Sequence, residues 1–120
     1  MASLKCRYTF ALSISLKEDF KTHVNKDGYG FRGKSKWASE AIEQLLSLKN
    51  FTELVNYNHK MINQLTEKDT LYIDFDLNKK LLESIPKVRK DFPLLEGVKS
   101  CIIRTAIIQR IIRGNLSQVT

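Results

Sequence analysis

The sequence predicts a mostly helical α+β fold built from two copies of one unit, in which a strand is followed by two helices. Segments with alternating apolar residues occur once in each half of the 120-residue chain, at 4–16 and 71–77. Segments with apolar residues at helical spacing follow each of them. One strand alone leaves its backbone hydrogen-bonding groups unpaired. Two copies in one chain are therefore expected to pair their strands and to share a core.

The first copy is predicted to begin with a strand over 4–16, because apolar and polar or small residues alternate there without interruption. A helix over 17–26 is predicted next, since Leu16, Phe20 and Val24 are spaced by four. The outer face of this strand is basic at its start and carries small hydroxyl side chains further along.

A second helix is predicted to begin with Ser35 as its N-cap and to reach about Lys49, with Trp37 in the core. A third helix, from Thr52 to Leu65, is expected to link the two copies. This link must bring the second strand back beside the first.

The second copy is predicted to contain a strand over 71–77 and a helix capped by Asn78. Pro86 is expected to break or kink that helix, and an irregular segment is expected up to Leu95. The last helix, about 100–113, is rich in isoleucine. At this length we expect a single domain. Its parts are a first unit over 4–49, a helical linker over 50–69, a second unit over 70–114 and a tail over 115–120.

The composition favours an intracellular binding protein. The net charge of +7 favours a polyanionic partner such as nucleic acid. Cys6 and Cys101 suggest buried thiols in a reducing compartment, so we expect a cytoplasmic protein without a disulfide framework. No signal peptide or membrane segment is expected. His23 and His59 lack ligand-spaced partners, so we expect no metal. The sequence contains neither a P-loop nor a nucleophile elbow, so we expect no cofactor and no enzymatic activity.

The repeat resembles a known family. The strand, the helix and a glycine-containing loop lead into Gly33-Lys-Ser and Ser39-Glu-Ala-Ile. This order resembles the ribbon-helix-helix family of the Arc and Met repressors. The likeness covers about residues 8–48 and 71–113. Both halves lie in one chain, as in the pseudo-dimeric form known among conjugative DNA-transfer accessory proteins.

The resemblance implies that the strands form an antiparallel ribbon whose outer face enters the DNA major groove. By position, the base-reading residues on that face are Ala11, Ser13 and Ser15 of the first strand and Tyr72, Asp74 and Asp76 of the second. Lys5, Arg7 and Thr9 lie on the same outer face, where the two cations would supply contacts that the matched positions lack. The N-termini of the second helices would bind phosphates, and the residues there are Lys34, Ser35, Lys36, Lys99 and Ser100. Family readers are typically Arg, Lys, Asn or Gln, whereas the matched positions here carry mainly Ala, Ser and Asp.

The predicted function is that of a double-stranded-DNA-binding protein, either a transcriptional repressor or an accessory factor for plasmid or transfer-DNA processing. We expect a monomeric pseudo-dimer, or a higher assembly on DNA, with a possible protein partner in a nucleoprotein complex. The alternative is a protein-interaction module that keeps this fold without reading DNA. The acidic pair Asp74 and Asp76 favours that alternative.

Overall fold

The computed structural model describes residues 4–30, 32–60 and 64–114, which form an α+β fold that is mostly helical. The predicted tail over 115–120 lies outside the described residues. The elements in chain order are β1 (Lys5–Leu12), α1 (Ile14–Lys26), α2 (Lys34–Leu46), α3 (Phe51–Lys60), β2 (Glu67–Asp74), α4 (Phe75–Asp91) and α5 (Val98–Arg113).

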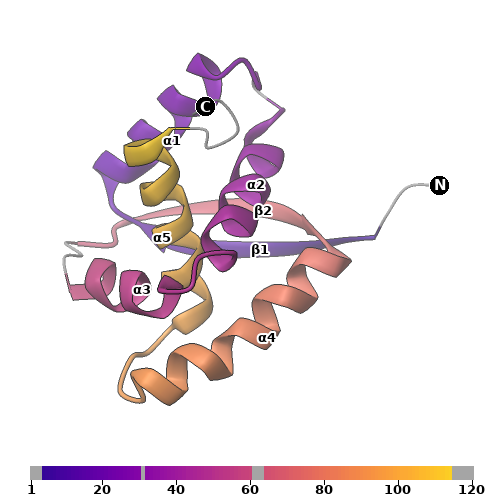
Figure 1. Cartoon of the computed structure of the whole chain (residues 1–120). Coiled ribbons are helices and arrows are strands. Elements are labelled where there is room, and N and C mark those ends of the chain that lie inside the picture. The colour runs from indigo at the N-terminus through magenta and orange to yellow at the C-terminus, as the bar shows by residue number, and fades with distance from the viewer. Residues whose placement is uncertain (1–3, 31, 61–63, 115–120) are drawn as a thin grey trace.

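The two strands lie side by side as an antiparallel ribbon across the middle of the molecule (Figure 1). The predicted pairing of the strands is therefore confirmed. The register runs from Lys5 opposite Asp74 to Leu12 opposite Glu67. Thr9 faces Thr70 near its centre, and their hydroxyl oxygens are 2.8 Å apart. When the two copies are aligned in sequence so that Leu16 matches Leu77, Thr9 matches Thr70. Equivalent residues of the two copies therefore face each other near the centre of the ribbon.

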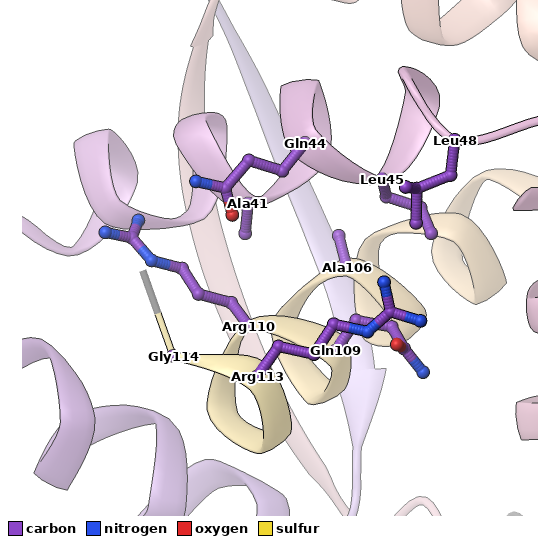
Figure 2. Close-up of a pocket in the computed structure, with 9 residues that line it drawn as sticks. All are labelled: Ala41, Gln44, Leu45, Leu48, Ala106, Gln109, Arg110, Arg113 and Gly114. Carbon is purple, nitrogen blue, oxygen red and sulfur yellow. The ribbon is translucent and has the colours of Figure 1, made fainter. Parts of the chain in front are cut away.

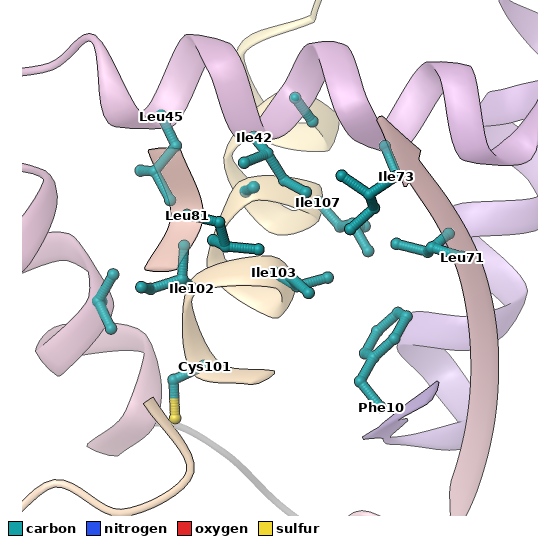
Figure 3. Packing of buried hydrophobic residues seen from close by; sticks show 14 of the residues in the cluster. Phe10, Ile42, Leu45, Leu71, Ile73, Leu81, Cys101, Ile102, Ile103 and Ile107 are labelled. Atoms are coloured by element: carbon teal, nitrogen blue, oxygen red, sulfur yellow. The ribbon is translucent and has the colours of Figure 1, made fainter. Parts of the chain in front are cut away.

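One face of the ribbon is buried against the helices and forms part of the hydrophobic core (Figure 3). Both strands contribute, and their buried residues are Phe10, Leu12, Leu71 and Ile73. Helix α2 of the first copy packs against helix α5 of the second. Ala41 and Ala106 lie on the facing sides of these two helices (Figure 2). Small side chains at this crossing allow the helix backbones to approach closely.

Both strands end before the predicted positions, and the reason is a helix start. β1 ends at Leu12, because the Ser13 hydroxyl accepts a hydrogen bond from the Leu16 N–H at 3.1 Å and caps α1. β2 likewise ends at Asp74, which is the N-cap of α4. β2 also begins at Glu67, earlier than predicted, within a stretch expected to be a polar turn and linker.

Three helices also differ from the predictions. α4 continues through Pro86 to Asp91, because Ser84 and Val88 on either side of the proline are buried and hold the chain in one helix. Burial therefore outweighs the hydrogen bond that proline cannot donate. α3 ends at Lys60, and residues 61–63 of its predicted length lie outside the described residues. Gly33 rather than Ser35 is the N-cap of α2.

Candidate nucleic-acid interface

The outward face of the ribbon, here called the solvent face, carries alternate residues of both strands. They are Lys5, Arg7, Thr9 and Ala11 of β1, with Lys68, Thr70, Tyr72 and Asp74 of β2. Alternate side chains of a strand point to the same face. These side chains are exposed or half-buried, whereas their neighbours along each strand point toward the helices. The solvent face thus presents three cationic side chains and one carboxylate.

The one carboxylate on this face is neutralised locally. Lys5 Nζ lies 2.9 Å from Asp74 Oδ1, and both side chains are about half exposed. An exposed pair of this kind contributes little to stability. Its consequence is electrostatic, because Arg7 and Lys68 then determine the net charge of the solvent face.

Three residues predicted for the ribbon do not lie on it, and the predicted acidic pair is not formed there. Ser13 caps α1, and Ser15 lies in the first turn of that helix. Asp76 lies in the first turn of α4, so Asp74 and Asp76 do not share a strand face. The predictions for Ser13, Ser15 and Asp76 were wrong because the alternation of apolar residues continues past the ends of both strands.

Two residues of the solvent face were missed by the sequence analysis, namely Lys68 and Thr70. The segment before Leu71 is polar on both faces, so apolar alternation cannot reveal that it is a strand. The repeat itself held the missing signal. When the two copies are aligned in sequence so that Leu16 matches Leu77, Lys68 corresponds to Arg7.

The start of α2 lies against the outer edge of β2. The Ser35 hydroxyl accepts a hydrogen bond from the Tyr72 N–H at 3.0 Å, and the Lys34 ammonium pairs with the Asp69 carboxylate. Lys36 is exposed on the same turn. The helix begins without a side-chain cap and without an acidic residue in its first turn, so its N-terminal dipole is not offset locally.

The start of α5 lies against β1 in the same manner. The Ser100 hydroxyl is 2.5 Å from the Tyr8 hydroxyl. Lys99 Nζ donates to Asn78 Oδ1 at 2.9 Å and lies 4.4 Å above the centre of the Tyr8 ring. Burial lowers the pKa of the Lys99 ammonium, and the charge of Cys6 partly opposes that shift. Lys34, Ser35, Lys99 and Ser100 therefore all bond within the protein.

Replacing Ser13 by alanine is expected to lower the free energy of unfolding by about 1 kcal/mol, because the cap of α1 is lost. Urea unfolding measures this change. Affinity for duplex DNA should stay within a factor of two of the parent protein, since Ser13 does not lie on the solvent face. A loss of affinity at unchanged stability would return Ser13 to the set of DNA contacts.

The two cysteine thiols lie apart from the solvent face of the ribbon. Burial raises the pKa of the Cys101 thiol against the opposing charge of Arg104, so the thiol is neutral at physiological pH. Both cysteines are free, and Cys6 is only half-buried. Across residues 4–30, 32–60 and 64–114, no cluster of three or more His, Cys, Asp or Glu side chains could hold a metal ion.

Among the helices that the structure describes, none is long and apolar enough to cross a membrane. No family model, characterised protein or solved structure gives a significant match to this chain.

Proposed function

We propose that this chain is a double-stranded-DNA-binding protein with a single-chain, pseudo-dimeric ribbon-helix-helix arrangement. In this proposal the solvent face of the ribbon enters the major groove, which accommodates a two-stranded ribbon. The protein would act as a transcriptional repressor or as an accessory factor in plasmid or transfer-DNA processing. The arrangement of Arg7 and Lys68 on this face carries the proposal.

The side chains at equivalent positions of the two strands support DNA contact. Arg7 and Thr9 on β1 correspond in the repeat to Lys68 and Thr70 on β2, so each strand presents one cation and one hydroxyl. Arginine and lysine donate to the acceptors of guanine, and threonine can bond to any base edge. Cationic residues thus stand at equivalent ribbon positions of the two copies.

The interlocking of the copies supports the pseudo-dimeric part of the proposal. α1 begins at Ile14 and α4 at Phe75, which are matched positions of the repeat. The start of α2 bonds to β2, and the start of α5 bonds to β1. Each copy therefore supports the strand of the other, as two subunits of an intertwined dimer would do.

The alternative of a protein-interaction module loses its main support. It depended on an acidic pair dividing the ribbon face, but Asp76 lies in α4 and Asp74 is paired with Lys5. No other observation on the described residues favours that alternative, so the DNA-binding proposal is the one carried forward.

The proposal is tested by titrating the protein into a labelled random-sequence duplex at several salt concentrations. Binding should weaken steeply as salt increases, because released counterions drive it. The double variant Arg7→Gln/Lys68→Gln should bind about a hundredfold more weakly, at roughly 1–3 kcal/mol per contact.

The matched control is Lys87→Gln/Lys90→Gln, which removes the same charge from exposed positions on the C-terminal half of α4. That part of α4 leads away from the ribbon (Figure 1). The control should retain most of the affinity. Equal losses in the two double variants would show that only net charge matters and would contradict binding through the ribbon. No duplex binding even at low salt would refute the proposed function.

A further inference from the structure

A second basic feature lies beside the ribbon, outside the solvent face. An open pocket of about 450 Å³ lies between α1, the start of α2 and β2, and its lining includes Lys17, Lys21, Val24, Gly30, Lys34 and Asp69. We call it the lysine pocket. Its three lysines come from two helices that are joined by a loop, and its carboxylate comes from the adjacent strand.

The ammonium groups of this pocket keep unused donors. Lys17 Nζ donates to the backbone carbonyl of Lys68 at 2.8 Å, which holds it at the edge of the ribbon without neutralising its charge. Lys34 pairs with Asp69, whose carboxylate also accepts from the Thr70 N–H at 2.9 Å. Lys21 is exposed. An ammonium group has three donors, so one internal bond each leaves Lys17 and Lys34 able to bind an anion.

The charge of the pocket is not balanced by its own lining. Asp69 is the one carboxylate among the lining residues, and it already accepts from Lys34, so about two positive charges remain. Lys17 and Lys21 are four residues apart on α1, and like charges at that spacing destabilise a helix. The lysine stems and Val24 cover the walls with apolar atoms. A bound anion would relieve this repulsion.

We propose that the lysine pocket binds a phosphate group, which the DNA backbone supplies when a duplex lies on the solvent face. The assignment of DNA as the source of this phosphate rests on the proposed function. The Lys17 ammonium bonds to the backbone of Lys68, whose side chain belongs to the solvent face. The strands of a duplex seated on the ribbon would pass along its edges, where this pocket opens.

The phosphate contact is one-sided, because the second copy lacks a matching pocket. The positions that correspond to Lys17 and Lys21 carry Asn78 and Leu82, which hold no charge. Lys99 corresponds to Lys34, and its ammonium is already held by Asn78 and Tyr8. We therefore expect the phosphate backbone of DNA to be bound more strongly at the β2 edge of the ribbon than at the β1 edge.

The test compares Lys17→Gln/Lys21→Gln with the charge-matched control Lys87→Gln/Lys90→Gln. The pocket variant should bind a random-sequence duplex about tenfold more weakly near physiological salt, and its salt dependence should have a slope smaller by about 2. Circular dichroism during heating should show that both variants fold. In a second arm, inorganic pyrophosphate is titrated while NMR follows the backbone amides of Lys21 and Gly30, which reports binding of a free anion.

The two arms separate the sources of phosphate and keep this proposal distinct from the proposed function. A selective loss of duplex binding in the pocket variant supports the backbone source. If the parent protein binds no duplex, the proposed function fails, but pyrophosphate shifts that vanish in the pocket variant would still establish a phosphate site. If duplex binding is strong and equal in both variants, and pyrophosphate moves no pocket amide, the lysine pocket is refuted while DNA binding stands.

Discussion

Replacing Arg110 by methionine is expected to lower the free energy of unfolding by about 3 kcal/mol, because a buried guanidinium with three hydrogen-bond partners is lost. Arg110 lies on α5 with only 3% of its surface exposed, and it extends toward α2 (Figure 2). Its guanidinium donates to the Trp37 carbonyl at 2.7 Å and to Glu40 Oε1 at 3.2 Å. It also donates to the Tyr29 hydroxyl at 3.1 Å and lies 4.5 Å from the centre of the Trp37 ring.

Methionine fills similar space but supplies none of these donors, so the Trp37 carbonyl and the Tyr29 hydroxyl each lose the donor that Arg110 provides. The Tyr29 hydroxyl keeps its bond to Glu40. The cost stays near the lower end for a broken buried ion pair, because the Glu40 side chain is 37% exposed and can be hydrated. Urea unfolding followed by tryptophan fluorescence measures the change at Trp37. Arg113→Met, at an exposed position on the same helix, is the control and should fall within about 0.5 kcal/mol of the parent. Equal stability of Arg110→Met and the parent would contradict the role of this contact.

Replacing Gly33 by alanine is expected to cost about 2 kcal/mol, because the new methyl group has no space. A Cβ atom at Gly33 would lie 2.6 Å from Tyr29 Cβ and 2.8 Å from the Tyr29 carbonyl carbon. The backbone φ of Gly33 is −92°, which other residues adopt readily, so the cost comes from contact and not from conformation. Tyr29 would have to move, and its hydroxyl bonds to Glu40 and Arg110.

Gly28 provides the comparison, because a substitution there is limited by the backbone conformation and not by space. Its φ is +81° and no atom lies within 4 Å of the position that a Cβ would occupy, so Gly28→Ala suffers conformational strain without a clash. Gly28→Asn should be less destabilised than Gly28→Ala, since asparagine tolerates positive φ. At Gly33, asparagine should be no better than alanine. Urea unfolding of the four variants tests this contrast, and rescue by asparagine at Gly33 would refute the steric explanation.

The sequence predicted the class of fold and the order of its strands and helices, because these follow from local periodicity. It also predicted the pairing of the strands, because two copies of a one-strand unit can satisfy each other's backbone hydrogen bonds. It misplaced the strand ends for a physical reason. Ile14 and Leu16 continue the alternation of β1, but Leu16 also begins the four-residue spacing of α1, and the Ser13 cap decides in favour of the helix. Apolar alternation could not reveal the start of β2, since that polar segment is extended through its pairing with β1.

The candidate interface was predicted in part for the same reasons. Lys5, Arg7 and Thr9 were placed correctly on the outer face, because the first half of β1 alternates clearly. The internal bonds of Lys34 and Lys99 could not be foreseen, because Asp69 and Tyr8 reach them only through the pairing of distant segments. Arg110 was also missed, since a charged residue in an apolar helix gives no sign that it is buried.

The exchange of contacts between the copies has a consequence during protein synthesis. When synthesis has reached the end of α3, β1 has no partner strand yet. The start of α2 also lacks β2, the strand to which it bonds. β2 pairs with β1 only after the intervening helices have been made, and α5 closes the core last. Contacts so distant in sequence form slowly. We therefore expect the first half of the nascent chain to keep apolar surface uncovered until the second half has been made.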